Sequence, residues 1–205
     1  MALSNNIGSW YWQSMKRVFS EFVFFAFLLV GCEASDSTSP EGAFARLAPC
    51  IDRGDARCLY FGLDRESHWS TQTIHRTLGE IHELVVRFYP ENMHRTAYGS
   101  WQKEVAAADP PEVFDMYCQR SRCLEKVSPG FGAVVKTVAV DSNTVVIETT
   151  RRQQFAMNEA DGRWGLGIFK EQLQQAKISL LDRLKQVKRN AAEFEKQRLA
   201  GVELK

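Results

Sequence analysis

Two long stretches of the chain repeat apolar residues every three or four positions, and each repeat predicts an amphipathic helix. The first begins at Ser70 and is stopped by Pro90, and its apolar face is formed by Ile74, Leu78, Ile81, Val85 and Phe88. The second spans Lys170 to about Arg198 without proline or glycine, and its stripe consists of Leu173, Leu180, Leu184, Val187, Ala191 and Phe194. We expect the first half of this second helix to pack on its own domain and its end, past about Ala191, to project or fray.

Shorter helical patterns lie on both sides of the first long helix. Ser39-Pro40-Glu41 starts a helix with a hydroxyl cap, a proline at the first helical position and an early acid. Pro49 should kink or end this helix near Ala48, because a proline inside a helix removes a backbone hydrogen bond. The other expected helices contain Leu59, Tyr60 and Leu63; Tyr98, Trp101 and Val105; and Asp109-Pro110-Pro111-Glu112 followed by Val113, Phe114 and Tyr117.

After Pro129-Gly130 the pattern becomes that of β-strands. Turn residues at 141–143 and at Asp161-Gly162 separate β-branched or alternating segments, which predicts an antiparallel meander. The segments are 132–140, 144–150, 152–158 and the alternation of Trp164, Leu166 and Ile168. Helices followed by a meander predict the α+β class, with one α+β domain over residues 40–169 and a C-terminal helix and tail over residues 170–205.

The N-terminal segment has the order of a secretion signal. Lys16-Arg17 supplies the only cations in the first 45 residues and precedes an apolar stretch of ten residues, Phe22 to Gly31. A positive region followed by a short apolar run is typical of a signal peptide. A permanent membrane span needs about 20 apolar residues, so this stretch is too short for one. Because residues 1–14 form an unusual leader without positive charge, translation is expected to start at Met15.

The apolar stretch leads into Leu29-Val30-Gly31-Cys32, which resembles the lipobox of bacterial lipoproteins. The resemblance implies that residues 1–31 are removed as a signal peptide, that the Cys32 thiol receives diacylglycerol, and that the new amino group is acylated. Several acyl chains give stable attachment, since each buried CH₂ contributes about 0.8 kcal/mol. Residues 32–39 are mostly small and polar and suit a flexible tether. We therefore expect a lipid-anchored protein of a bacterial cell envelope, in the outer membrane rather than the inner one where a cell has both.

Four cysteines remain once Cys32 carries lipid, and an oxidising compartment favours disulfides between them. They are Cys50, Cys58, Cys118 and Cys123. Pairing Cys50 with Cys58 and Cys118 with Cys123 is the simplest solution locally, but four cysteines allow three connectivities. On an unbroken helix Cys118 and Cys123 would lie about 140° apart around the axis. Their pairing would need the helix to end near Arg120; otherwise the bridges run between segments, or the thiols stay free.

Two groups of short motifs flank the predicted domain. They are Ser39-Pro40-Glu41, Phe44-Ala45, Arg53-Gly54-Asp55-Ala56, Leu59-Tyr60 and Leu63 at its start, and Asp161-Gly162-Arg163-Trp164-Gly165 at its end. With the layout of helices and strands, they resemble the nuclear-transport-factor-2-like superfamily, which includes the SnoaL-like proteins. The resemblance implies a cone-like curved sheet around a pocket that is catalytic, ligand-binding or simply filled. Pro49, the helical residues from 91 to 126 and the C-terminal helix depart from the family pattern.

The weak candidate for catalysis is His68. A histidine beside an acid such as Asp64 or Glu66 could act as a general base, because its usual pKa of about 6.5 suits that work. We favour a structural interpretation instead, in which Trp69 lies in the core, His68 lies on the surface and Ser70 caps a helix. If a pocket exists, its expected lining is aromatic: Tyr60, Trp69, Tyr98, Trp101, Phe155 and Trp164.

No metal or cofactor is expected. His75 and His82 are seven residues apart on one predicted helix, about 10.5 Å along its axis, which is too far for one shared ion. Neither a phosphate-binding glycine loop nor a metal-binding or nucleophile motif occurs in the sequence.

Charge and motifs together indicate a class of function. Without residues 1–31, which contain Lys16, Arg17 and Glu21, 24 basic and 24 acidic side chains remain. This balance gives no support to nucleic-acid binding. We expect a non-catalytic envelope domain, tethered to the membrane through Cys32, that binds a protein partner or an apolar small molecule. The alternatives are a SnoaL-like enzyme doing general acid–base chemistry in a small pocket, and a structural assembly component acting through its C-terminal helix.

Overall fold

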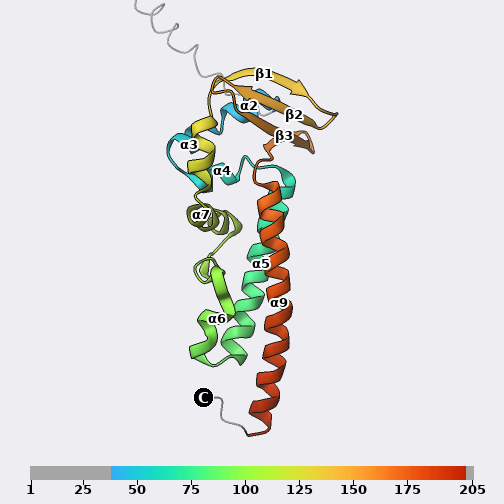
Figure 1. The fold of residues 1–205 in the computed structure, drawn as a ribbon. Coiled ribbons are helices and arrows are strands. Elements are labelled where there is room, and N and C mark those ends of the chain that lie inside the picture. Colours follow the sequence, from blue (N-terminus) through green and yellow to red (C-terminus); the bar gives the residue numbers. More distant parts are fainter. Residues whose placement is uncertain (1–37, 202–205) are drawn as a thin grey trace, which may run out of the picture. The chain divides into compact units, whose positions relative to one another are not determined.

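Residues 38–201 are the part of the chain that a computed structural model describes, and they belong to the second of two units, Ser37–Lys205. This unit has the α+β class that the sequence predicts (Figure 1). Helices come first, a four-stranded antiparallel sheet follows, and a long helix completes the unit. That last helix contributes to the same hydrophobic core as the elements before it.

Three short helices begin the unit. α2 (Pro40–Ala45) starts as predicted, and the Ser39 hydroxyl accepts a hydrogen bond from the Gly42 amide at 3.1 Å. The break predicted near Ala48 is confirmed: a new helix, α3 (Ala48–Asp52), carries Pro49 in its first turn, where a proline is tolerated. α4 (Ala56–Tyr60) follows a turn and is capped by the Asp55 side chain.

Helix α5 (Arg65–Phe88) begins earlier than its apolar repeat predicts. Its cap is Asp64, whose Oδ1 accepts a hydrogen bond from the Ser67 amide at 2.9 Å. Polar side chains, among them Ser67 and Ser70, fill the buried face of the first turns of this helix. The apolar repeat in the sequence therefore does not extend to the start of the helix. The expectation that Ser70 caps this helix is therefore wrong.

Short helical segments connect α5 to the sheet. They are the 3₁₀ turns Glu91–Met93, Gly99–Trp101, Glu104–Ala106 and Ser128–Gly130, and the helices α6 (His94–Tyr98), α7 (Pro110–Ser121) and α8 (Cys123–Val127). The single helix expected around Tyr98, Trp101 and Val105 is wrong, because Gly99, with a φ of 60°, interrupts it. α7 starts as predicted, since the Asp109 side chain caps it by accepting a hydrogen bond from the Glu112 amide.

A buried ion pair joins two of these connecting segments. Glu104 is 2% exposed, and its Oε1 lies 2.6 Å from Nη1 of Arg120 on α7. The same guanidinium lies over the Trp101 ring, 4.5 Å from its centroid. Within residues 38–201, the other Glu104 oxygen, Oε2, has no hydrogen-bond partner. The buried charge of Glu104 therefore depends on Arg120.

The antiparallel sheet is open, and its strands follow the chain order. The strands β1 (Val134–Ala139), β2 (Thr144–Thr149), β3 (Gln154–Ala160) and β4 (Arg163–Leu166) agree with the predicted meander to within a few residues. Burial alternates along β2 and the first half of β3, with Val145 and Ile147 of β2 and Phe155 and Met157 of β3 directed into the core. Helix α2 packs against β1, β2 and β4.

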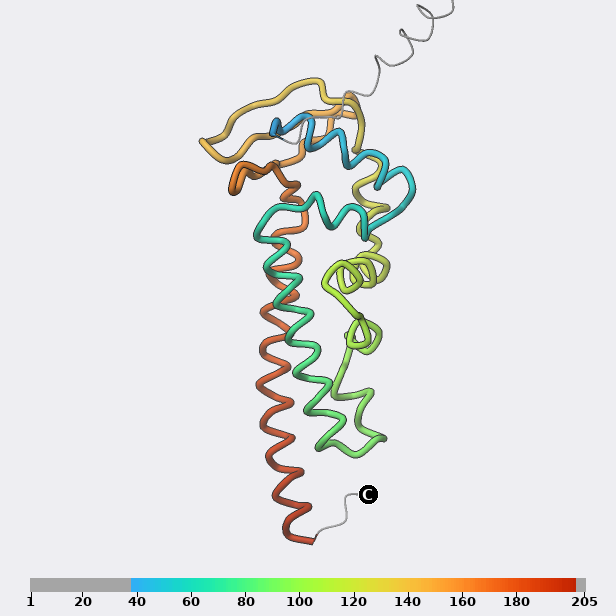
Figure 2. The backbone as a smooth tube through the Cα atoms, turned by 180° about the vertical axis from the view of Figure 1, so that it is seen from behind, coloured from blue at the N-terminus to red at the C-terminus, as the bar shows by residue number. Residues whose placement is uncertain are grey.

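Helices α5 and α9 (Lys170–Leu199) lie side by side and run in the same direction away from the sheet, as Figures 1 and 2 show. At their starts, Lys170 Nζ lies 3.0 Å from Glu66 Oε2, and toward their ends the Tyr89 hydroxyl donates to the Val187 carbonyl at 3.1 Å. The predicted stripe of α9 is buried at Leu173, Leu180, Leu184, Val187 and Ala191. Segments α6 and α7 lie along the other flank of α5.

Past Ala191, where the sequence predicts that α9 projects or frays, the helix does not fray but stays helical to Leu199, and none of residues 192–199 is fully buried. Phe194 is half-buried, and its ring packs edge-on against Tyr89 with the two centroids 4.8 Å apart. Leu199 is 80% exposed. Phe194 is thus the last residue of α9 packed against the hydrophobic core.

Candidate functional site

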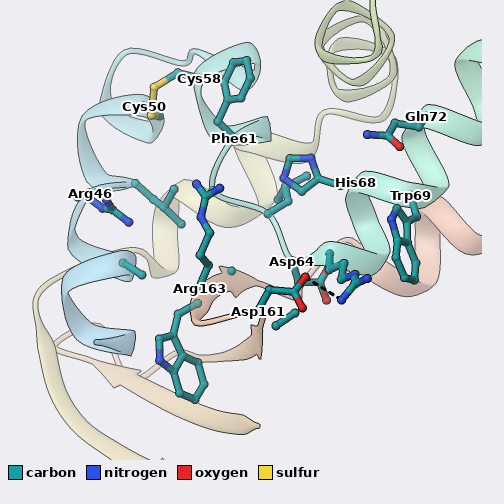
Figure 3. Close-up of a pocket in the computed structure, with 18 residues that line it drawn as sticks. Arg46, Cys50, Cys58, Phe61, Asp64, His68, Trp69, Gln72, Asp161 and Arg163 are labelled. Atoms are coloured by element: carbon teal, nitrogen blue, oxygen red, sulfur yellow. Dashed lines mark hydrogen bonds and ion pairs between the residues drawn. A yellow bond between two sulfur atoms is a disulfide. The ribbon is translucent and has the colours of Figure 1, made fainter. Parts of the chain in front are cut away.

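A cavity of about 590 Å³ lies where α2, α3, the end of α4, the start of α5 and the β3–β4 turn meet (Figure 3). Its lining combines charged, aromatic and apolar side chains with the Cys50–Cys58 disulfide. The volume falls within the range of about 300–1,000 Å³ that is typical of small-molecule sites. This cavity is therefore the candidate site.

Asp64 fixes the start of α5 to the sheet beside the cavity. Its Oδ1 caps the helix through the Ser67 amide, and its Oδ2 accepts a hydrogen bond from Asn158 Nδ2 on β3 at 2.8 Å. Its own amide donates to the Leu166 carbonyl on β4 at 3.1 Å. Strand and helix start come so close that a Cβ on Gly165 would lie 2.6 Å from the Asp64 Cα. Both carboxylate oxygens of Asp64 are thus engaged in holding the structure.

The β3–β4 turn forms one rim of the cavity. Asp161 and Gly162 have φ values of 53° and 74°, the conformation that an Asp-Gly pair favours in a two-residue hairpin turn. The turn places Asp161 Oδ2 2.8 Å from Arg65 Nη1. The Arg65 guanidinium also lies over the Trp69 ring, 4.3 Å from its centroid. The charges of Asp161 and Arg65 therefore neutralise one another.

Two further arginines, Arg46 of α2 and Arg163 of β4, line the same cavity. Both are exposed, and within residues 38–201 neither guanidinium forms an ion pair with a carboxylate. In Figure 3 the Arg163 side chain extends from its strand into the cavity, with its guanidinium between Arg46 and His68. With three arginines and two aspartates, the lining carries one net positive charge, and Arg46 and Arg163 are the arginines without a carboxylate partner among the described residues.

His68 lies in the first turn of α5 and is half-buried in the cavity wall. Its ring packs edge-on against Tyr60, with centroids 4.4 Å apart. Burial lowers the pKa of His68 below the usual 6.5, and the charge of Arg163 lowers it further, against opposing effects of Asp64 and the Leu63 backbone. The imidazole is therefore neutral at neutral pH. Since both oxygens of Asp64 are already hydrogen-bonded, that carboxylate is not free to orient the ring as in a catalytic pair.

Two aromatic rings at this site are open to solvent. Trp69 is 52% exposed and Phe61 is 65% exposed. The expectation of a core position for Trp69 is wrong, because the first turn of α5 directs this side chain out of the core and along the cavity. Phe61, Arg46 and Arg163 were not among the residues predicted for a site.

The six aromatic residues expected to line one pocket are distributed over the unit. Only Trp69 and Trp164 line the cavity described above. Tyr60 is buried in the core, and Tyr98 and Trp101 are buried in the segments between α5 and α7. Phe155 belongs to the core and also lines a separate cavity of about 270 Å³.

The structure pairs the cysteines locally. Cys50 is bonded to Cys58, with Cα atoms 5.4 Å apart, and this bridge joins α3 to α4 at the cavity wall. Cys118 is bonded to Cys123, with Cα atoms 4.9 Å apart. The second bridge is possible because α7 ends at Ser121 and Arg122 adopts the left-handed conformation, which provides the break that such a pairing needs.

His75 and His82 take part in separate contacts. His75 Nε2 lies 3.3 Å from the Ala107 carbonyl oxygen, and His82 Nδ1 lies 2.9 Å from the Tyr98 hydroxyl. In the part of the chain that the structure describes, no three His, Cys, Asp or Glu residues gather as metal ligands would.

Comparison with protein-family models, with characterised proteins and with solved structures gives no significant match. The lipobox residues and Cys32 lie outside the described residues. Among the helices of residues 38–201, none has the length and apolar character needed to cross a membrane. The features of this chain that bear on its function are therefore the N-terminal sequence and the cavity.

Proposed function

We propose that this chain is a lipoprotein of a bacterial cell envelope, tethered to a membrane by lipid on Cys32, and that its folded unit binds the apolar part of a small molecule or of a partner protein. The support for the tether is the charged region, the short apolar run and the lipobox-like Leu29-Val30-Gly31-Cys32. The support for binding comes from the cavity at the start of α5.

The exposure of Phe61 and Trp69 carries the binding proposal. Leaving apolar surface in water is unfavourable by roughly 25 cal/mol per Å². The exposed parts of these two aromatic rings beside one cavity therefore do not stabilise the fold by burial. Exposed aromatic side chains next to a concave surface are typical of binding sites. A ligand that covers the rings would recover this free energy.

Binding can be measured by calorimetry with naphthamide, a neutral aromatic probe, on the full-length chain. Phe61→Ala should weaken binding about tenfold, because a covered aromatic ring contributes roughly 1.5–3 kcal/mol. Val86→Ala is the matched control, since Val86 is 57% exposed on α5 but does not line the cavity. Equal affinities of both variants and the unchanged protein would refute the proposed site.

The tether has its own test. Mass measurement of the N-terminal peptide from membrane-extracted protein should show a chain that begins at Cys32 and carries acyl groups. Cys32→Ser should abolish the modification, because a hydroxyl is a poor substitute for a thiol in thioether formation, whereas Ser35→Ala should leave it intact. An unmodified Cys32 or cleavage at another bond would contradict the tether.

One observation favours an enzyme as a second candidate. His68 lines the cavity with a lowered pKa, so its neutral ring could accept a proton from a bound substrate. This would correspond to the general acid–base chemistry implied by the SnoaL-like resemblance. The third candidate, assembly through the C-terminal helix, has less support, because the main apolar stripe of α9 is buried within the unit beside α5.

A further inference from the structure

The charges around the cavity are unevenly matched. Three arginines and two aspartates line it, and the aspartates already have partners: Asp161 binds Arg65, and Asp64 accepts two hydrogen bonds from its own surroundings. The guanidinium groups of Arg46 and Arg163 are left without a carboxylate in the described part of the chain. A site of this kind attracts negative charge.

Arg163 is held in place by its backbone. It directly follows the Asp161-Gly162 turn and opens β4. The rest of that strand is fixed by the close approach of Gly165 to Asp64 and by the hydrogen bond between the Leu166 amide and the Gly62 carbonyl at 2.8 Å. The guanidinium therefore extends into the cavity from a rigid base, as Figure 3 shows. A fixed base lowers the entropy lost when the group binds a ligand.

The apolar surfaces of the cavity lie close to these charges. Phe61 and Trp69 belong to the same lining as Arg46 and Arg163. In Figure 3 the two rings lie on opposite sides of the Arg163 guanidinium, and the Trp69 ring is already covered on one face by Arg65. One ligand could thus contact guanidinium groups with one end and the Phe61 ring with the other. A guanidinium presents parallel N–H donors that match the oxygens of a carboxylate or a phosphate.

We propose that the cavity binds a small amphiphilic anion, with its carboxylate or phosphate held by Arg46 and Arg163 and its apolar body against Phe61. This inference rests on the proposed binding function and adds the chemical class of the ligand. Neither lining aspartate would have to give up its present partner.

Three probes with the same ring test this inference: naphthoate, naphthyl phosphate and the neutral naphthamide. The unchanged full-length protein should bind at least one of the two anions about tenfold or more tightly than naphthamide, because charged hydrogen bonds are roughly twice as strong as neutral ones. The preferred anion then shows whether the natural group is a carboxylate or a phosphate.

Arginine variants locate the effect. Arg46→Gln and Arg163→Gln should each weaken binding of the preferred anion about fivefold to tenfold and change naphthamide binding less than about twofold. The control is Arg189→Gln, which removes one positive charge from an exposed position of α9. An equal loss in the control would show a general charge effect and overturn the inference.

His68 provides a readout at the site itself. Bound anion should raise the pKa of His68, measured by NMR titration, because it offsets the charge of Arg163. If the two anions and naphthamide bind equally, the anionic ligand is refuted while the binding site remains. If none of the three probes binds, the proposed binding function itself is refuted.

Discussion

At the scale of single residues, Glu104 and Arg120 show how a buried charge constrains the fold. Arg120→Met should lower the free energy of unfolding by about 3 kcal/mol, because it leaves the Glu104 carboxylate buried without a counter-charge. Adding Glu104→Gln to Arg120→Met should recover part of the loss, since a neutral amide is less costly to bury. Urea unfolding of the single and double variants measures both effects. A double variant no more stable than Arg120→Met would contradict this account.

His68 should make stability depend on pH. Its folded-state pKa is lowered, so as pH falls below about 6.5 the unfolded chain takes up a proton before the folded one does. The contribution of His68 to stability is therefore complete above that pH and is lost as the pH falls toward the folded-state pKa. His68→Gln should flatten this part of the curve when the free energy of unfolding is measured between about pH 5 and pH 8. An unchanged slope in the variant would contradict the lowered pKa.

Residue-level sequence reasoning named His68, Trp69 and Trp164 but missed Arg46, Phe61 and Arg163. The aromatic search favoured rings on predicted apolar faces, whereas Phe61 follows α4 and is exposed on the opposite side from the buried Leu59 and Tyr60. The signal in the sequence that could have identified Phe61 is that this aromatic residue does not belong to the predicted apolar face. The two arginines carried none, because a surface arginine and a ligand-binding arginine look alike until their neighbours are known.

At the scale of elements, the contact between β4 and the start of α5 depends on a glycine. Gly165→Ala should lower the free energy of unfolding by about 1–3 kcal/mol, because the new Cβ would lie 2.4 Å from the Leu63 carbonyl oxygen and force the segments apart.

A second glycine provides the control. Gly79 of α5 has no atom within 4 Å of where its Cβ would be, so Gly79→Ala should stabilise by roughly 0.5–1 kcal/mol. Thermal unfolding compares the two variants. Destabilisation by both to the same extent would show that the close approach is not the cause.

Two truncations of different length test which residue at the end of α9 makes the last important contact. Deleting residues 192–205 should lower the free energy of unfolding by about 2–3 kcal/mol, since it removes the Phe194 ring from Tyr89. Deleting residues 195–205 should cost less than about 1 kcal/mol, because Phe194 remains. Thermal unfolding of both truncations decides this, and equal losses would mean that Phe194 is not the last important contact.

Element prediction was most successful where the pattern reflected packing directly. The meander, α7 and α9 were predicted because their apolar periods and turn residues are undisturbed. The start of α5 was missed because Ser67, Ser70 and Thr71 fill its buried face, and polar residues do not register in an apolar repeat. Near Tyr98 the reverse happened: an apolar spacing suggested a helix that Gly99 does not permit.

At the scale of the whole described unit, the class was predictable and the assembly was not. Two amphipathic stripes were visible in the sequence, but nothing in either stripe states that α5 and α9 pair or that they run in the same direction. The cavity likewise joins helices α2 to α5, which follow one another in the chain, to the β3–β4 turn, which lies far from them in sequence. The period of the apolar residues shows which side of a helix or strand is buried. Which other element covers that side is decided by the packing of all the elements together.

The pairing of α5 with α9 also bears on how the protein is made. Ser70 and Gln174, hydrogen-bonded across the pair, are 104 positions apart, and α9 is synthesised after every other described element. Until then the apolar stripe of α5 lacks its long partner, and contacts between residues so distant in sequence form slowly. A chain without α9 would therefore expose an apolar surface that the complete unit covers. A premature stop before α9 should for this reason yield an insoluble product.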